Sequence, residues 1–327
     1  MKELGLHRIV QTAFALYMCV VGVQFSMFVS WALGKSEIFV PRPSAVEAFL
    51  PISALLAAKR FVLTGAWDNV HPAGLTLFFF ALSSALLLRK SFCGYFCPLG
   101  ALSDALFRLG RHLGVIRTLP KYAEYLLLLP KYVLLAFFLS LPFVVMSLSD
   151  IEDFLFSHYN LVCDTKMLLF FLEPTQAVVL FLLLVILGSI FFPSFWCRSF
   201  CPYGALLGLL ALCSPFAVQR KESRCTDCGA CNRACPQAIR ISAKKRIISP
   251  ECTACLECVR VCPTSCLNLH LGGGRRSVAL SRTSFVLLIL SVFALFYVWA
   301  VMTGHWTSEV PKEMVRMLHE NIRAVVH

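Results

Sequence analysis

Five apolar stretches limit what this chain can fold into. Crossing the hydrocarbon core of a bilayer takes about 20 mostly apolar residues in a helix. Hydrophobic residues make up 58% of the chain and charged residues only 15%, whereas about a quarter of a soluble domain is charged. We therefore predict an α-helical integral membrane protein with about five transmembrane helices. The predicted helices cover residues 9–33, 73–88, 125–148, 175–192 and 284–302.

Lysines and arginines are distributed unevenly between the segments that join these helices. If the N-terminus lies inside, the inner segments 1–8, 89–124 and 193–283 contain 21 of the 30 basic residues, and the outer segments contain eight. Cytoplasmic segments of membrane proteins carry such an excess of positive charge. We therefore expect a cytoplasmic N-terminus and an outside C-terminus. Anionic lipid headgroups attract positive charge at the inner face, so the net charge of +12 indicates a membrane lipid partner and no nucleic acid.

Two cysteine runs with the same spacing follow one another in the last inner segment. The run "CTDCGACNRACP" begins at Cys225, and "CTACLECVRVCP" begins at Cys252; each places cysteines at intervals of three, three and four residues before a proline. An iron–sulfur cubane needs four thiolates. Zinc also favours four thiolates, but zinc sites pair cysteines two and two across a longer gap. Because the predicted inner side is reducing, the runs indicate two iron–sulfur clusters, not zinc or disulfides.

Over residues 220–270 the chain resembles the bacterial two-[4Fe–4S] ferredoxin family at every cysteine position. In that family, three cysteines of one run bind a cluster together with the fourth cysteine of the other run. The resemblance implies that one [4Fe–4S] cluster binds to Cys225, Cys228, Cys231 and Cys262. It implies that the second binds to Cys252, Cys255, Cys258 and Cys235.

The segment between the runs and the charge of this region add two expectations. Residues 239–249, "IRISAKKRIIS", predict a hairpin with a basic turn. Soluble ferredoxins of this type tend to be acidic, yet residues 220–282 contain twelve basic and four acidic side chains. This charge suits either contact with an anionic leaflet or docking of an acidic partner.

A shorter repeat, "FCGYFCPLGAL" and "WCRSFCPYGAL", contains Cys93 and Cys97, then Cys197 and Cys201. Each pair is spaced by four residues and precedes a proline, which suits the first turn of a new helix. The positive end of that helix favours thiolate at the cysteine. The two pairs could bind a third iron–sulfur cluster, act as a redox-active dithiol, or only cradle the ferredoxin domain.

Residues 5–270 as a whole resemble the NapH and NosR type of membrane-bound polyferredoxin. The resemblance rests on the apolar helices, the two Cys-x-x-x-Cys-Pro motifs and the double cysteine run. It implies a quinol dehydrogenase-type subunit of the bacterial inner membrane that passes electrons from quinol through iron–sulfur centres to a partner oxidoreductase. The fifth apolar stretch departs from the four-helix form of NapH.

The sequence accordingly divides into three parts. Residues 1–219 are expected to form a four-helix membrane domain with the two short motifs. Residues 220–272 are expected to form an inserted, small α+β ferredoxin domain with two [4Fe–4S] clusters. Residues 273–327 are expected to form a basic link, the fifth transmembrane helix and an outside tail.

A quinol site needs a proton acceptor, a hydrogen-bond donor and an apolar slot. At the predicted outer helix ends, "AWDNVHPAG" contains His71 and Asp68, our candidate catalytic pair. A histidine near its ordinary pKa suits proton transfer. The apolar spacing of residues 43–61 suggests an interfacial helix that could roof the slot. Alternatively, the polar residues only cap helix ends. Other candidates in these loops are Asp150, Glu152, Asp153, His158 and His305.

Lys131 falls six residues into the third apolar stretch. A cation inside a membrane helix is costly unless it is paired or reaches the interface. We expect the helix to begin later and to leave Lys131 at the interface.

Three functions fit these features. The first is an electron-transfer subunit that connects the quinone pool to iron–sulfur clusters for a partner redox protein. The second is a redox assembly or maturation factor, and the third is a redox sensor that uses the same clusters. The chain has no Walker loop, which argues against nucleotide hydrolysis.

Overall fold

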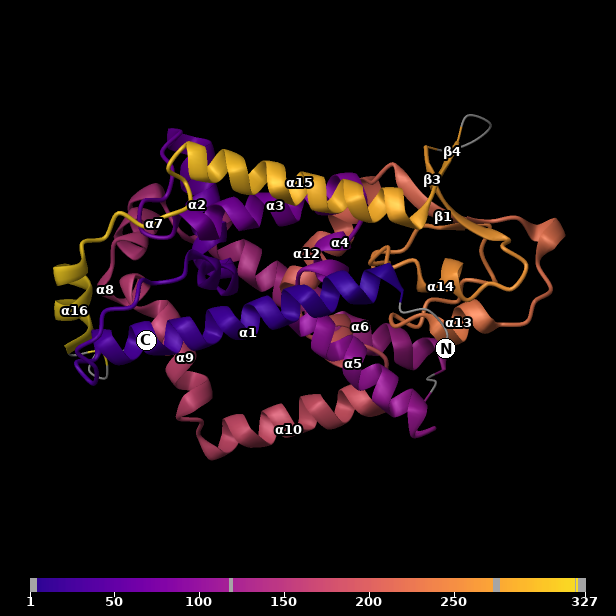
Figure 1. The fold of residues 1–327 in the computed structure, drawn as a ribbon, viewed down its shortest axis with the longest axis horizontal. Helices are drawn as coiled ribbons and strands as arrows, with labels where there is room; N and C mark the ends of the chain where they lie inside the picture. The colour runs from indigo at the N-terminus through magenta and orange to yellow at the C-terminus, as the bar shows by residue number, and fades with distance from the viewer. Residues whose placement is uncertain (1–4, 118–119, 273–276, 321, 323–327) are drawn as a thin grey trace. The chain divides into compact units, whose positions relative to one another are not determined.

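The computed structural model of the protein is mostly helical (Figure 1). It describes residues 5–117, 120–272, 277–320 and 322, so most of the predicted basic link lies outside the described residues. The chain divides into two compact units. Unit 1 comprises Met1–Leu16, Ala81–Leu135 and Leu182–Phe293. Unit 2 comprises Tyr17–Phe80, Ala136–Phe181 and Ala294–His327.

All five predicted apolar stretches are helical. Among the described residues, three spans are long and apolar enough to cross a membrane, or four if the bent pair α9 and α10 is one span. The two helices of that pair meet at 80°, and α3 has only 17 residues. The helices are α1 (Leu6–Ala32), α3 (Pro72–Leu88), α6 (Lys121–Ser140) continued by η2 (Leu141–Val145), α9 (Cys163–Leu172), α10 (Gln176–Phe191) and α15 (Arg282–Met302).

Most side chains of these spans point away from the protein. Only 22% of the apolar window of α1, 17% of that of Tyr122–Val145 and 22% of that of α15 are buried. Water would disfavour so large an exposed apolar surface, whereas lipid tails suit it. The protein is therefore a helical membrane protein.

A small antiparallel sheet in unit 1 joins the two cysteine runs. Its strand order is β2-β1-β3-β4. The central strand β1 pairs Val218 with Ile247 on one side and with Leu269 on the other, and these three side chains are buried. The strands are β1 (Phe216–Arg220), β2 (Arg246–Ile247), β3 (Leu267–Leu271) and β4 (Val278–Leu280). Each cysteine run adds one short helix, α13 (Ala230–Ala234) or α14 (Glu257–Arg260).

The predicted hairpin over residues 239–249 is wrong. Its first half forms no strand, because Asn232 Oδ1 accepts hydrogen bonds from the backbone N–H groups of Ile241 (2.7 Å) and Ser242 (3.0 Å). In the second half only β2 is a strand, and it pairs with β1.

The two short motifs of unit 1 have the same local structure. In each, a one-turn helix carries the first cysteine, and the proline after the second cysteine begins the next helix, as the motif predicts. Gly100 is required, since a Cβ there would lie 2.1 Å from the carbonyl oxygen of Cys93. The helices are α4 (Ser91–Tyr95), α5 (Pro98–His112), α11 (Phe195–Ser199) and α12 (Pro202–Leu210). Two short 3-10 helices follow: η3 (Ala211–Cys213) directly after α12, and η4 (Glu222–Arg224) after β1.

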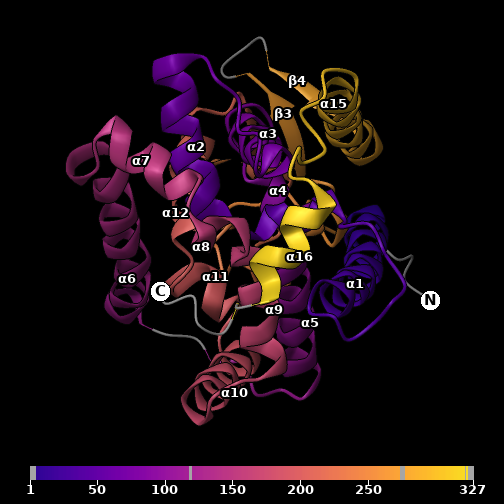
Figure 2. The ribbon, with the colours of Figure 1, turned by 90° about the vertical axis from the view of Figure 1, so that its left-hand side faces the viewer.

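Short helices make up much of unit 2. Within the predicted interfacial segment 43–61, the chain forms η1 (Ser44–Phe49) and begins α2 (Pro51–Thr64). The Lys59 ammonium on α2 donates to the carbonyl oxygens of Pro142 (2.5 Å) and Met146 (2.9 Å). Figure 2 shows α2 beside α7. The remaining helices are α7 (Leu148–Leu155), α8 (His158–Leu161) and α16 (Lys312–Glu320).

Lys131 lies inside α6, so our expectation that the helix begins after it is wrong. Its side chain is fully buried and forms a short ion pair with Glu251 Oε1. Lys90 Nζ lies 3.6 Å from Glu251 Oε2. Burial alone would raise the pKa of Glu251, but Lys90 and Lys131 lower it below its usual range. This ion triad, Lys90–Glu251–Lys131, makes the buried cation tolerable.

Replacing Glu251 by Gln should therefore destabilise unit 1 by about 3–5 kcal/mol, because two buried ammonium groups lose their counter-charge. The measurement is the apparent melting temperature of the protein in detergent. Glu222→Gln is the matched control, because Glu222 forms its 2.9 Å pair with Lys245 at the surface, where such a pair contributes less than about 1 kcal/mol. Equal melting temperatures for the two variants would contradict a supporting role for the triad.

Candidate iron–sulfur sites and a polar cavity

The eight cysteines of the double run line two separate cavities in unit 1. Each cavity takes three cysteines from one run and one from the other, which is the grouping that crossed ligation needs. The first cavity is lined by Cys225, Cys228, Cys231 and Cys262, with Cys266 beside them. The second cavity is lined by Cys235, Cys252, Cys255 and Cys258. Among the described residues, no three His, Cys, Asp or Glu side chains lie close enough to bind a single metal ion.

The backbone curls around both cavities in the same way. Residues two, four and thirteen positions after the first cysteine of each run have a positive φ. In the first run these are Asp227, Gly229 and Ala238, and in the second run they are Ala254, Leu256 and Ser265. A non-glycine residue pays about 1–2 kcal/mol for this conformation. Matched strain of this kind marks a site where the chain must wrap a common centre.

The donor set of the cavities fits a bound iron–sulfur cluster. Burial raises the pKa of Cys235 to about 12, and the neighbouring thiol of Cys252 adds to the shift. The pKa values of Cys255 and Cys258 are raised well above the usual range for the same reasons. Free thiolates are therefore unfavourable here, whereas bound metal cations stabilise them.

The two cavities differ in their surroundings within unit 1. In the first cavity Cys228 is exposed to solvent, and Cys225 is partly exposed. The second cavity packs against the first short motif, because the Tyr95 hydroxyl donates to the carbonyl oxygen of Ala254 at 3.2 Å. A Cβ at Gly94 would lie only 3.0 Å from the carbonyl oxygen of Thr253. One cavity thus faces solvent, and the other faces α4.

The structure brings the cysteines of the two short motifs together. Burial, together with the Cys201 thiolate near both, raises the pKa of Cys97 to about 11 and that of Cys197 to about 12. Ser103 Oγ lies 3.5 Å from Cys197 Sγ. The Lys90 ammonium is close enough to lower the pKa of both thiols. The two motifs therefore form one four-thiol site beside the ion triad, and sequence analysis had not singled out Lys90.

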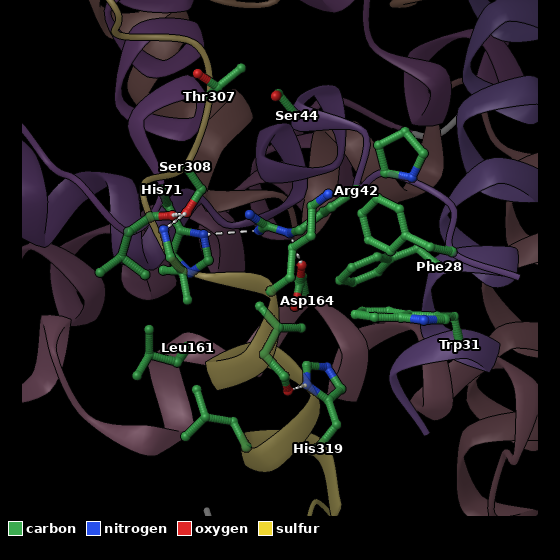
Figure 3. Close-up of a pocket in the computed structure, with 17 residues that line it drawn as sticks. Phe28, Trp31, Arg42, Ser44, His71, Leu161, Asp164, Thr307, Ser308 and His319 are labelled. Carbon is green, nitrogen blue, oxygen red and sulfur yellow. Dashed lines mark hydrogen bonds and ion pairs between the residues drawn. The ribbon is translucent and has the colours of Figure 1, made fainter. Parts of the chain in front are cut away.

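Unit 2 contains a separate cavity of about 180 Å³ with aromatic and charged walls (Figure 3). The aromatic wall comes from α1 and the loop after it, as Phe28, Trp31 and Phe39. The polar wall consists of Arg42, His71, Asp164 and His319. The predicted residue His71 thus lines a cavity, while the predicted residue Asp68 is not among the lining residues.

Arg42 holds the polar wall together. Its Nε lies 2.6 Å from Asp164 Oδ2, and its Nη1 lies 2.8 Å from Glu47 Oε1. Its Nη2 lies 3.0 Å from His71 Nδ1. The Glu47 and Asp164 side chains are almost completely buried, so each carboxylate depends on Arg42 for its charge balance. An arginine between two prolines, with a glutamate five residues later, was the signal that sequence analysis missed.

His71 has two hydrogen-bond partners that define its proton. Arg42 can only donate, so Nδ1 must accept, and Nε2 then donates to the carbonyl oxygen of Asn160 at 2.8 Å. This geometry describes a neutral ring. Burial also favours the neutral ring, whereas the Cys163 thiol and the Glu47 carboxylate act against it and raise the pKa of His71 above its ordinary value. We assign the neutral form from the Arg42 contact, and the carboxylate makes proton uptake by this ring favourable.

Five other candidates from the predicted outer loops make structural contacts outside this polar group. Asp68 Oδ1 accepts from the backbone N–H of Val70 (2.9 Å), and burial raises the pKa of Asp68. Asp150 forms a capping box with Ser147 at the start of α7. Glu152 pairs with Arg60, His158 contacts the carbonyl oxygen of Leu318, and His305 contacts Thr303 Oγ1.

Two family models match the parts of the chain that carry these cysteines. A 4Fe-4S binding domain matches residues 70–116 and 175–223, which contain both short motifs. A 4Fe-4S dicluster domain matches residues 217–263, which contain both cysteine runs. The protein therefore has iron–sulfur binding domains. No solved structure matches the chain.

Curated relatives are similar over much of the chain. It is 36% identical to the putative electron transport protein YccM of Escherichia coli over 289 residues, and this alignment covers 87% of this chain and 81% of YccM. It is 30% identical to protein NirI of Paracoccus denitrificans over 59% of this chain and 27% of NirI. It is 28% identical to the methylamine utilization ferredoxin-type protein MauN of Methylorubrum extorquens, over 59% of this chain and 63% of MauN. These matches agree with the NapH and NosR resemblance, and the chain belongs to the family of membrane-associated, ferredoxin-type electron transport proteins.

Proposed function

We propose that the protein moves electrons between the quinone pool and its iron–sulfur clusters for a partner oxidoreductase. The supporting observation is the cavity of unit 2, where an aromatic wall stands opposite the buried group of Arg42 and His71. Quinone rings need an apolar slot with a few placed polar groups. Membrane electron carriers of the family have a reason to hold such a slot, because quinones dissolve in the bilayer.

The proposed placement is that of a bacterial inner-membrane protein with a cytoplasmic ferredoxin domain at residues 220–272. The membrane domain precedes it at 1–219, and the fifth helix and an outside tail follow it at 273–327. The excess of basic residues in the inner segments supports this orientation.

The cavity offers places for the protons of a quinol. Quinol oxidation to quinone releases two electrons and two protons. His71 Nδ1 takes one proton from a quinol hydroxyl once that hydroxyl replaces Arg42 as the partner of Nδ1. The protonated ring and Arg42 then face the two carboxylates of Glu47 and Asp164, so the group carries no net charge. His319, whose pKa burial lowers, is the second neutral imidazole in the wall.

Iron–sulfur clusters supply one-electron chemistry when bound, and the residues of unit 1 would hold them. Cys225, Cys228, Cys231 and Cys262 suit one [4Fe–4S] cluster. The second set is Cys235, Cys252, Cys255 and Cys258. Both sets come from loops that the central strand β1 joins to one sheet, which fixes the two sites relative to each other.

We further propose that the two short motifs bind a third iron–sulfur cluster. The convergence of Cys93, Cys97, Cys197 and Cys201 supports a shared site, and the 4Fe-4S binding domain model covers both motifs. Lys90 adds a positive charge that stabilises thiolate ligands there.

His71→Gln should slow the reduction of the clusters by a quinol analogue by about 100-fold, because the proton acceptor is lost. The measurement is anaerobic bleaching of the cluster absorbance after mixing with the reduced analogue. Reduction by dithionite should be unchanged, because it bypasses the cavity. The matched control is His112→Gln at the exposed end of α5, which should retain the wild-type rate. A His71→Gln protein that reacts with quinol at the control rate would exclude His71 as the acceptor.

Arg42→Gln should change the pH dependence of the same reaction. Removing the cation beside Nδ1 raises the pKa of His71, because Arg42 no longer lowers it while Glu47 and Cys163 still raise it. The ring is then protonated at pH 7 and cannot accept a proton, so the rate should fall about tenfold. The rate should recover only at alkaline pH, where the ring of the variant loses this proton. A rate that stays low at every pH would show that Arg42 acts otherwise.

The iron content tests the third cluster. Two cubanes contain about eight iron atoms per chain, and three contain about twelve. Anaerobically purified protein should hold about twelve, and a Cys93→Ser, Cys197→Ser variant should hold about eight. The matched control is Cys213→Ser, at an exposed cysteine outside the motifs, which should keep about twelve. Eight iron atoms in wild type and variant alike would overturn the third cluster and leave the first two.

A further inference from the structure

We propose that the solvent-facing side of the first cysteine cavity is a docking surface for an acidic, soluble one-electron carrier protein. The inference rests on the electron-transfer role and on the cluster placement proposed above, and it names the kind of partner. The surface, here called the basic patch, adjoins the exposed Cys228. It consists of Arg220, Lys221, Arg224, Arg233, Lys244 and Lys245.

The basic patch is continuous with the wall of the first cavity. Arg220 lines this cavity, and Arg233 Nη2 donates to the carbonyl oxygen of Cys228 at 3.0 Å. The backbone N–H of Arg220 donates to the carbonyl oxygen of Lys245 at 2.8 Å, which places the basic turn of 244–245 beside β1. A carrier on this patch would therefore sit directly over Cys225 and Cys228, where electron transfer is shortest.

Most positive charge of the patch is available to a partner. Two acidic side chains lie within it: Glu222 pairs with Lys245 (2.9 Å) and Arg220 (3.5 Å), and Asp227 lies 3.8 Å from Arg220. In the described part of the chain, Lys221, Arg224, Arg233 and Lys244 have no ion-pair partner. Six basic and two acidic groups leave a strongly positive surface, which attracts a negatively charged protein.

The second cavity offers no comparable access. Its cysteines Cys235 and Cys258 are buried, and Tyr95 on α4 closes over the Cys252 loop through its hydrogen bond to Ala254. An electron that leaves or enters the pair of clusters through a soluble partner therefore does so at the first cavity.

A soluble partner fits the position of the patch better than a lipid surface does. Within unit 1, the chain between β1 and α13 projects past the first residues of α15, away from the direction in which that helix runs (Figure 1). Headgroups lie at the ends of membrane helices, so the patch, which lies beyond such an end, is turned toward the aqueous phase.

The transfer itself moves one electron and no proton. The carrier loses one electron to the cluster at the first cavity, or gains one from it, and no covalent bond forms or breaks. The proposal sets the docking site and the charge of the carrier, and the relative potentials decide the direction.

The test uses the full-length, cluster-loaded protein in detergent and a fully reduced, acidic flavodoxin as the probe. Stopped-flow absorbance of the flavin follows its one-electron oxidation by the oxidised protein. Raising the ionic strength from about 0.05 M to about 0.5 M should slow the second-order reaction by about tenfold or more. Arg224→Glu should slow it about threefold to tenfold at low salt, because it reverses one charge of the patch.

Two controls make the result specific. Arg240→Glu makes the same change of net charge at an exposed arginine that is not part of the patch and lies 3.8 Å from Glu124 of α6, and it should alter the flavodoxin rate less than about twofold. Reduced methyl viologen, a small donor that needs no docking surface, should react equally with wild type and Arg224→Glu. Iron analysis of each sample confirms that the clusters are present, and no quinol is used, so loss of the quinol site leaves the result intact.

Three outcomes would overturn the proposal. They are a flavodoxin rate that does not depend on salt, equal effects of Arg224→Glu and Arg240→Glu, and no flavodoxin reaction by a protein whose clusters methyl viologen reduces. A patch that binds lipid would also overturn the proposal. In that case transfer into nanodiscs of anionic lipid would abolish the effect of Arg224→Glu on the flavodoxin rate, whereas neutral lipid would preserve this effect.

Discussion

The exchange of one cysteine between the two runs is the constraint on which unit 1 depends. Cys262 lies with the first three cysteines of the first run, and Cys235 lies with those of the second. Neither half can complete its cavity alone, so both must fold together. The sheet serves this arrangement, because β1 precedes the first run, β2 lies between the runs and β3 follows the second. The buried Lys90–Glu251–Lys131 triad then ties the second run to a membrane helix and to the first short motif.

Sequence reasoning succeeded where a pattern determines local structure. The apolar stretches are helical, and the cysteine grouping that the ferredoxin resemblance implies is the one that lines the two cavities. Fewer helices than expected are long enough to cross a membrane by themselves. The helix α3 has 17 residues, and α10 has 16 and is bent by 80° against α9. The hairpin failed because the Asn232 side chain, a distant competitor, takes the backbone donors of one predicted strand.

The polar wall of unit 2 lay largely beyond sequence reasoning. His71 was identified from its loop, but Arg42 and Glu47 come from an earlier segment and Asp164 from a much later one, and only the fold brings them to one imidazole. Asp68, which stands closest to His71 in sequence, turns instead to the backbone at Val70. Proximity along the chain was a poor guide to partnership here, and Lys131 found its counter-charge 120 residues away.

The left-handed residues at matching offsets of the two runs have a consequence for how the protein is made. Leu256 and Ala254 lack the conformational freedom of glycine, and yet both have the positive φ that L-residues avoid. Metal–thiolate bonds offset this kind of tension, and metal binding and folding are then a single event. Folding of this domain is thus coupled to iron supply. A cell short of iron or sulfide would accumulate chains whose helices have entered the bilayer but whose ferredoxin-type domain has not completed its fold.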